Sequence, residues 1–146
     1  MTSSPNPAPV PGKIIRIAAA LVCRPDGHTL LVRKRGTSAY MQPGGKIEPN
    51  ETPLTALLRE LREELALHLA PKDLSYVGAF SAPAANESGY VVHAEVFRVD
   101  IESAVTPAAE IEEIVWIDPA SPTGLNLAPL TRDFILPHYA MSATKD

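Results

Sequence analysis

The stretch that decides the fold is PGGKIEPNETPLTALLRELREELAL, residues 43–67. A glycine turn and a short acidic loop are followed by a helical pattern. Thr52 is a favourable N-cap residue, and Pro53 follows at the first helical position, where a missing N–H costs nothing. Leucines recur at helical spacing on one stripe, so the helix is expected to cover one face of a sheet.

An acidic face lies beside the leucine stripe. At about 100° per residue, Glu60, Glu63 and Glu64 cluster there, and like charges at this spacing destabilise a helix by roughly 0.2–0.5 kcal/mol per pair. A hard divalent cation such as Mg²⁺ would relieve the repulsion, because it takes oxygen ligands and is often shared with substrate phosphates. A solvated face, relieved by Arg59 and Arg62, is the alternative interpretation of the same pattern.

The spacing of the whole stretch resembles the signature of the Nudix hydrolases, G-x5-E-x7-R-E-U-x-E-E-x-G-U, where U is a bulky aliphatic residue. The matching positions are Gly45, Glu51, Arg59, Glu60, Leu61, Glu63, Glu64 and Leu67. Ala66 stands where the family has glycine. A glycine there would end the helix in a left-handed conformation, which costs alanine about 1–2 kcal/mol. The helix therefore either ends at Ala66 under strain or continues to Pro71.

Length and composition fit one globular domain of 146 residues. We expect a Pro-rich tail at 1–12, one domain at 13–141 and a short tail at 142–146. The net charge of −4 does not indicate a nucleic-acid polymer or a membrane surface as partner. Cys23 is the only cysteine, and with no visible export signal this favours a cytoplasmic location. No apolar run reaches membrane-spanning length.

The rest of the chain alternates between strand patterns and loops. Strands are expected at Lys13–Cys23, Thr29–Arg35, Leu74–Ser81, Tyr90–Val99 and Ile114–Ile117, with a final helix at Leu127–Met141 that is interrupted or ended near Pro137. The first two strands should form a hairpin. The pattern alone predicts one domain of the α/β or α+β class. The resemblance implies an α/β/α sandwich, with a mixed central sheet between the signature helix and the C-terminal helix.

The resemblance also implies a reaction, since Nudix hydrolases cleave a pyrophosphate linkage, usually in a nucleoside diphosphate joined to another group. Mg²⁺ is the expected cofactor, with Mn²⁺ as the alternative. Glu60, Glu63 and Glu64 match the metal-binding carboxylates, and Gly44 matches a position whose backbone carbonyl can bind metal. Glu51 and Arg59 match a supporting pair in which the arginine orients a carboxylate.

Four further residues are candidates for the site. Glu110 lies in a late acidic loop, where many relatives bring another glutamate; a solvated loop is the alternative. Arg35 and Lys46 could contact phosphate or base, although solvated surface charge is the default for such residues. Tyr40 could stack on a base.

The expected partner is a small nucleotide or nucleotide-like diphosphate. The sequence leaves two substrate types open, a nucleoside triphosphate and an ADP-ribose or nucleotide-sugar compound. A non-catalytic nucleotide-sensing module is the alternative from another functional class. Isoprenoid diphosphate isomerisation is disfavoured, because it requires a cysteine in the substrate pocket and Cys23 lies in an early buried strand. A monomer and a homodimer are both compatible with the sequence.

Overall fold

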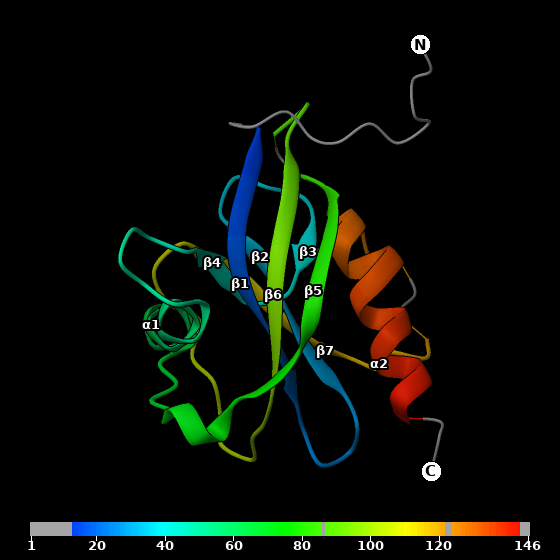
Figure 1. Cartoon of the computed structure of the whole chain (residues 1–146). Coiled ribbons are helices and arrows are strands. Elements are labelled where there is room, and N and C mark those ends of the chain that lie inside the picture. The colour runs from blue at the N-terminus through cyan, green and yellow to red at the C-terminus, as the bar shows by residue number, and fades with distance from the viewer. Residues whose placement is uncertain (1–12, 86, 122–123, 144–146) are drawn as a thin grey trace.

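A computed structural model describes residues 13–85, 87–121 and 124–143. The predicted N-terminal tail, 1–12, and residues 144–146 of the predicted C-terminal tail lie outside these ranges. Within them, a mixed seven-stranded sheet lies between two helical layers (Figure 1). Helix α1 (Pro53–Leu65) covers one face, and the C-terminal helix covers the other. The predicted α/β/α sandwich is confirmed.

The sheet is organised around its first strand. Its strands are β1 (Ile14–Cys23), β2 (Thr29–Lys34), β3 (Tyr40–Met41), β4 (Gly44–Lys46), β5 (Ser75–Pro83), β6 (Val91–Asp100) and β7 (Ile111–Ile117). Their order is β3-β2-β1-β6-β5, with β4 paired to β1 and β7 paired to β2. The β1–β6 pair is parallel and the other pairs are antiparallel. Strand β1 therefore contacts both the glycine turn and the far half of the sheet.

The structure corrects three expectations about strands. The predicted hairpin exists only at its turn, because β1 and β2 pair only at Cys23 and Thr29 before β4 takes the neighbouring position on β1. The glycine turn is itself strand β4. Strand β7 begins at Ile111, within the predicted acidic loop, because Arg33 of β2 pairs with Glu113 across the ladder and offsets its charge.

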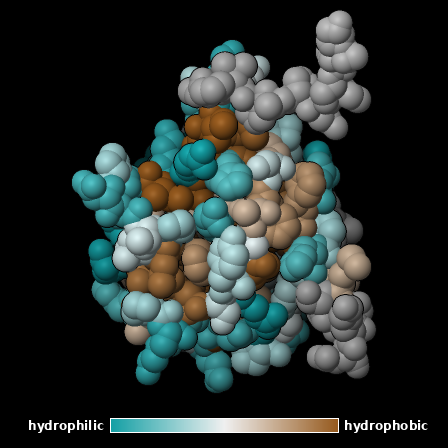
Figure 2. Space-filling model, viewed as in Figure 1, coloured by the Kyte–Doolittle hydropathy of each residue, from teal (hydrophilic) through white to brown (hydrophobic). Residues whose placement is uncertain are grey.

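The two faces of the sheet have separate cores. On the α1 face, Leu57, Leu61 and Leu65 are fully buried against the sheet, and each contributes about 1.5–3 kcal/mol by leaving water. On the opposite face, Leu21 and Tyr139 belong to a second buried cluster. In the view of Figure 2, exposed hydrophobic residues form patches separated by hydrophilic ones.

Both ends of α1 are capped. Thr52 Oγ1 accepts from the Thr55 N–H, and Thr55 Oγ1 accepts from the Thr52 N–H. At the other end, Ala66 adopts φ 57° and ψ 32°. Its N–H donates to the Arg62 carbonyl at 3.1 Å, and the Leu67 N–H donates to the Leu61 carbonyl at 3.2 Å. The helix therefore ends in a strained left-handed alanine and does not continue to Pro71.

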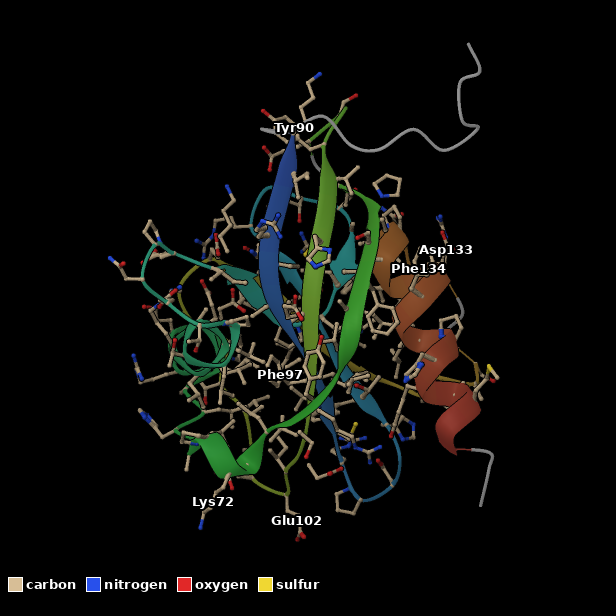
Figure 3. All side chains as sticks on the ribbon, viewed as in Figure 1. Lys72, Tyr90, Phe97, Glu102, Asp133 and Phe134 are labelled. Carbon is tan, nitrogen blue, oxygen red and sulfur yellow. The ribbon has the colours of Figure 1, made fainter. Side chains whose placement is uncertain are left out.

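The C-terminal helix contains a π-helical turn. This turn, Thr131–Ile135, leads directly into α2 (Leu136–Ala143), and the Leu136 N–H donates to the Thr131 carbonyl five residues earlier. Pro137 explains the widening, because its ring would clash with the preceding turn of a regular α-helix. The labelled side chains of Asp133 and Phe134 lie on the outer side of this helix (Figure 3). Across the described ranges, no helix is long and apolar enough to cross a membrane.

Candidate active site

Glu64 is the most unusual carboxylate of the site. Its side chain is 1% exposed, and its Oε1 accepts a hydrogen bond from the Gly44 N–H at 3.2 Å. Its Oε2 is buried and has no hydrogen-bond partner among the described residues. Burial raises the pKa of Glu64 to about 8, against the opposing charge of Lys34 and with a further increase from Glu60. The fold thus holds a carboxylate in a position that favours its neutral form.

Two glycines allow this arrangement. Gly44 has φ +145°, and a Cβ there would collide with the Ala18 backbone carbonyl of β1. At Gly45 a Cβ would collide with the Glu60 carboxylate. Strand β4 therefore lies directly against β1 on one side and against the acidic face of α1 on the other.

Arg59 organises the remaining carboxylates. It holds Glu51 in a bidentate contact, with Nε–Oε2 at 2.7 Å and Nη2–Oε1 at 2.9 Å. Hydrogen bonds from Arg59 lower the pKa of Glu51 to about 2 and raise the pKa of Arg59. Its Nη1 also donates to Glu60 at 3.1 Å and to Glu63 at 3.4 Å, and its Nη2 donates to the Lys46 carbonyl at 3.2 Å. One guanidinium thus joins β4, the acidic loop and α1.

The chemistry of the donor atoms is compatible with a hard divalent cation. All candidate side-chain ligand atoms are carboxylate oxygens, and one of them, Glu64 Oε2, is buried without a hydrogen-bond partner among the described residues. Among the described residues, no three acidic or histidine side chains already converge, since Glu60 and Glu63 face Arg59. The Glu63 side chain is 52% exposed and can therefore turn away from Arg59 with little obstruction.

A loop after β6 reaches the same end of α1. The Thr106 N–H donates to the Leu65 carbonyl at 3.1 Å, and the Ala108 N–H donates to the Glu64 carbonyl at 2.9 Å. Glu110 follows, and its Oε2 lies 3.4 Å from Lys34 Nζ. Glu110 is therefore paired with Lys34, the residue whose positive charge lowers the pKa of Glu64. Sequence reasoning did not select Lys34.

A cleft of about 160 Å³ opens next to β4. Its apolar walls come from β1, from the end of β5 and the loop after it, from β6 and from the start of the C-terminal helix; they include Ile15, Ile17, Ala19, Pro83, Val92 and Leu130. Lys34 and Lys46 supply positive charge beside Gly44 and Gly45, and Gln42 and Thr131 supply buried polar groups. Lys46 is thus placed where substrate could reach it.

Two predicted substrate contacts lie elsewhere. Arg35 does not line the cleft; its Nε lies 3.3 Å from Glu112, and its side chain is 66% exposed. Tyr40 also lies outside the cleft lining and donates its hydroxyl to Glu113 at 2.8 Å. Both residues contact glutamates of β7, a strand that begins earlier than the sequence predicted.

Comparison with known proteins agrees with this geometry. Residues 13–136 match the NUDIX domain family. The match includes the glycine strand, the acidic helix and the sheet that positions them. The chain therefore belongs to the NUDIX family and is a Nudix hydrolase, as its signature predicts.

Several relatives are similar over nearly their whole length. CTP pyrophosphohydrolase from Escherichia coli K12 is 31% identical over 138 residues, which cover 91% of this chain and 97% of that protein. The solution structure of the E. coli ORF135 protein has a TM-score of 0.71 and 29% identity, covering 94% of this chain and 96% of the other. A Nudix hydrolase family member from Chromobacterium violaceum gives a TM-score of 0.73 at 28% identity, covering 94% and 83% respectively.

Proposed function

We propose that this chain hydrolyses a phosphoanhydride bond of a nucleoside triphosphate, with Mg²⁺ held on the acidic face of α1. The observation that supports this most directly is the buried, half-satisfied carboxylate of Glu64 next to Glu60. A bound cation would supply the partner that this carboxylate oxygen lacks. The cleft and its two lysines adjoin the same strand, so phosphate and metal would meet there.

Each residue has a definite task in this proposal. Glu60, Glu63 and Glu64 would hold the ion, with the Gly44 carbonyl as a further candidate ligand. A divalent ion at this point neutralises phosphoryl charge and lowers the pKa of a bound water. Arg59 and Glu51 form the pair that positions the acidic face.

Charge near the cleft completes the assignment. Lys34 and Lys46 would bind phosphate oxygens, because they line the cleft beside β4. Glu110 lies within ion-pair distance of Lys34 and would hold that lysine in place. Hydrolysis adds one water across the P–O–P bridge. The carboxylates of Glu60 and Glu63, which lie near Glu64, are suited to accepting the proton that this water releases.

A nucleoside triphosphate is favoured over an ADP-ribose or nucleotide-sugar compound for two reasons. The relative that matches over 97% of its own length is named CTP pyrophosphohydrolase. The cleft of about 160 Å³ is small, which suits one base better than two nucleoside units. ADP-ribose remains in the test as the competing substrate type.

The test is phosphate or pyrophosphate release from a panel of nucleoside triphosphates, ADP-ribose and nucleotide sugars, with Mg²⁺ or Mn²⁺. Glu64→Gln should reduce turnover by at least about a hundredfold, because it removes a metal ligand at the reacting centre. Glu102→Gln is the matched control, since Glu102 is exposed, does not line the cleft and lies at the opposite end of the molecule from Tyr90 (Figure 3).

Turnover that Glu64→Gln leaves unchanged would refute the assignment of the metal site. Tight nucleotide binding without any turnover would instead favour a sensing module. Turnover of ADP-ribose alone would retain the reaction and overturn the substrate type. Each outcome is distinguishable in one set of assays on the full chain.

A further inference from the structure

One buried polar pair in the cleft has no task in the hydrolytic site. Gln42, between β3 and β4, is 6% exposed, and Thr131, in the π-helical turn, is 1% exposed. The Thr131 hydroxyl donates to Gln42 Oε1 at 2.6 Å. Gln42 Nε2 is buried and has no hydrogen-bond partner among the described residues. Both side chains belong to the cleft lining.

Toward the cleft this pair offers the N–H donors of Gln42 Nε2, while the Gln42 amide oxygen already accepts a hydrogen bond. The amide oxygen of Gln42 is occupied by the hydroxyl of Thr131, while both protons on Nε2 are unused. Buried polar groups in folded proteins nearly always have a partner, so an unused donor on a cleft wall indicates that a ligand supplies the acceptor. The surrounding walls are aliphatic, which suits the faces of a planar ring.

We propose that Gln42, oriented by Thr131, determines base specificity by donating to the acceptor edge of cytosine. This inference rests on the proposed function, because it assigns the base of the same nucleotide. Cytosine presents N3 and O2 as adjacent acceptors. Uracil places an N–H between its two carbonyl groups, and that donor would face Nε2 without an acceptor. Adenine places its amino donor beside N1 and N7.

Guanine offers the acceptors N7 and O6 side by side, so hydrogen bonding alone does not exclude it. Size separates the two bases, because cytosine has one ring and the cleft measures about 160 Å³. The proposal therefore commits to a pyrimidine with adjacent acceptors. A preference for GTP that depended on Gln42 would overturn the assignment to cytosine.

The experiment measures kcat/KM for CTP, UTP, GTP and ATP with Mg²⁺. Wild type should prefer CTP, and Gln42→Met, which keeps length and removes the donor, should lower the CTP/UTP ratio at least about tenfold. The loss should fall mainly on KM, since Gln42 contacts the base and not the reacting phosphate. Thr131→Val should lower the ratio in the same direction, because the amide loses its orienting hydroxyl.

A matched control separates specificity from damage to the fold. Asn126→Met also exchanges an amide for a thioether, but Asn126 is exposed, bonds Ser38 and lies outside the cleft lining. Its CTP/UTP ratio should equal that of wild type. Gln42→Met should melt near the wild-type temperature, because it removes an unpaired buried donor and also the acceptor of the Thr131 hydroxyl, two effects of opposite sign. Equal losses on all four nucleotides, or an unchanged ratio, would overturn the proposal.

Binding measurements keep this inference separable from the proposed reaction. Calorimetric titration of the full chain with CMP and UMP requires no turnover. Tighter binding of CMP that Gln42→Met abolishes supports base reading by Gln42, even if no triphosphate is hydrolysed and the proposed function fails. Equal affinities for CMP and UMP, or no binding of either, overturn it.

Discussion

Replacing Glu64 by glutamine should stabilise the metal-free protein at neutral pH. The pKa of this carboxyl rises from 4.5 to about 8 on folding. Between these values the unfolded chain has released the proton while the folded chain retains it, so stability falls as pH rises from 4.5 to 8. Glutamine does not titrate in this range, so the stability of the variant should not fall as the pH rises.

The magnitude follows from the same two values. At pH 7 the unfolded group is 2.5 pH units above its pKa of 4.5, which at about 1.4 kcal/mol per unit amounts to about 3.5 kcal/mol. Glutamine retains an unpaired polar atom where Oε2 lies, so the net gain should be about 2 kcal/mol. Near pH 4 the contribution of protonation should vanish, so the variant should be about 1 kcal/mol less stable than wild type, and above pH 8 its gain should reach a plateau.

Urea denaturation in EDTA at pH 5, 6, 7 and 8 measures this difference, with Glu102→Gln as the control. The gap between Glu64→Gln and wild type should widen steadily over the series. Added Mg²⁺ should then stabilise wild type and leave the variant nearly unchanged, because a ligand that binds only the folded state shifts its stability. A variant less stable than wild type at pH 7, or a gap independent of pH, would refute the account of Glu64.

Three further predictions concern the residues around this site. Ala66→Gly should raise the free energy of unfolding by about 0.5–1 kcal/mol, since φ 57° strains alanine, whereas Ala108→Gly, outside that region, should lower it in the same thermal denaturation assay. Gly45→Ala should reduce Mg²⁺-dependent turnover about tenfold or more with little change in melting temperature, because its methyl displaces Glu60; unaltered kinetics would contradict this. Arg59→Lys should shift the acidic limb of the pH–rate profile to higher pH, because a single ammonium cannot replace the bidentate contact that lowers the pKa of Glu51. A limb at the wild-type pH would count against this assignment.

Local sequence rules predicted the parts of the fold that depend on near neighbours. Thr52 and the leucine stripe were sufficient for α1, because capping and helical periodicity are local properties. The same periodicity placed three glutamates on one face but could not show that Glu64 alone is buried. That burial depends on β4 and on the loop that bonds its carbonyl through Ala108.

The substrate cleft was less accessible to prediction. Strand alternation from Leu30 and Val32 could have identified Lys34 as the cation on the α1 face, in place of Arg35. Gln42 and Thr131 gave no such signal, because they are 89 residues apart and meet only when the C-terminal helix packs on the sheet. Contacts of this kind depend on tertiary packing and leave no periodic trace in the sequence.

The π-helical turn lets the C-terminal helix absorb a change of one residue in its length. Such a turn holds one residue more than an α-helical turn. It connects Thr131 on the cleft wall to Leu136 and Tyr139, which are buried against the sheet. Deleting exposed Phe134 would restore α-helical spacing and keep those two anchors at nearly the same angle to Thr131, because the removed residue is the extra one held by the π-helical turn. In the evolution of such chains, loss of one residue within this turn can therefore leave the core and the cleft wall in place, whereas loss of a residue from the regular part of the helix would rotate its two ends by about 100° relative to each other.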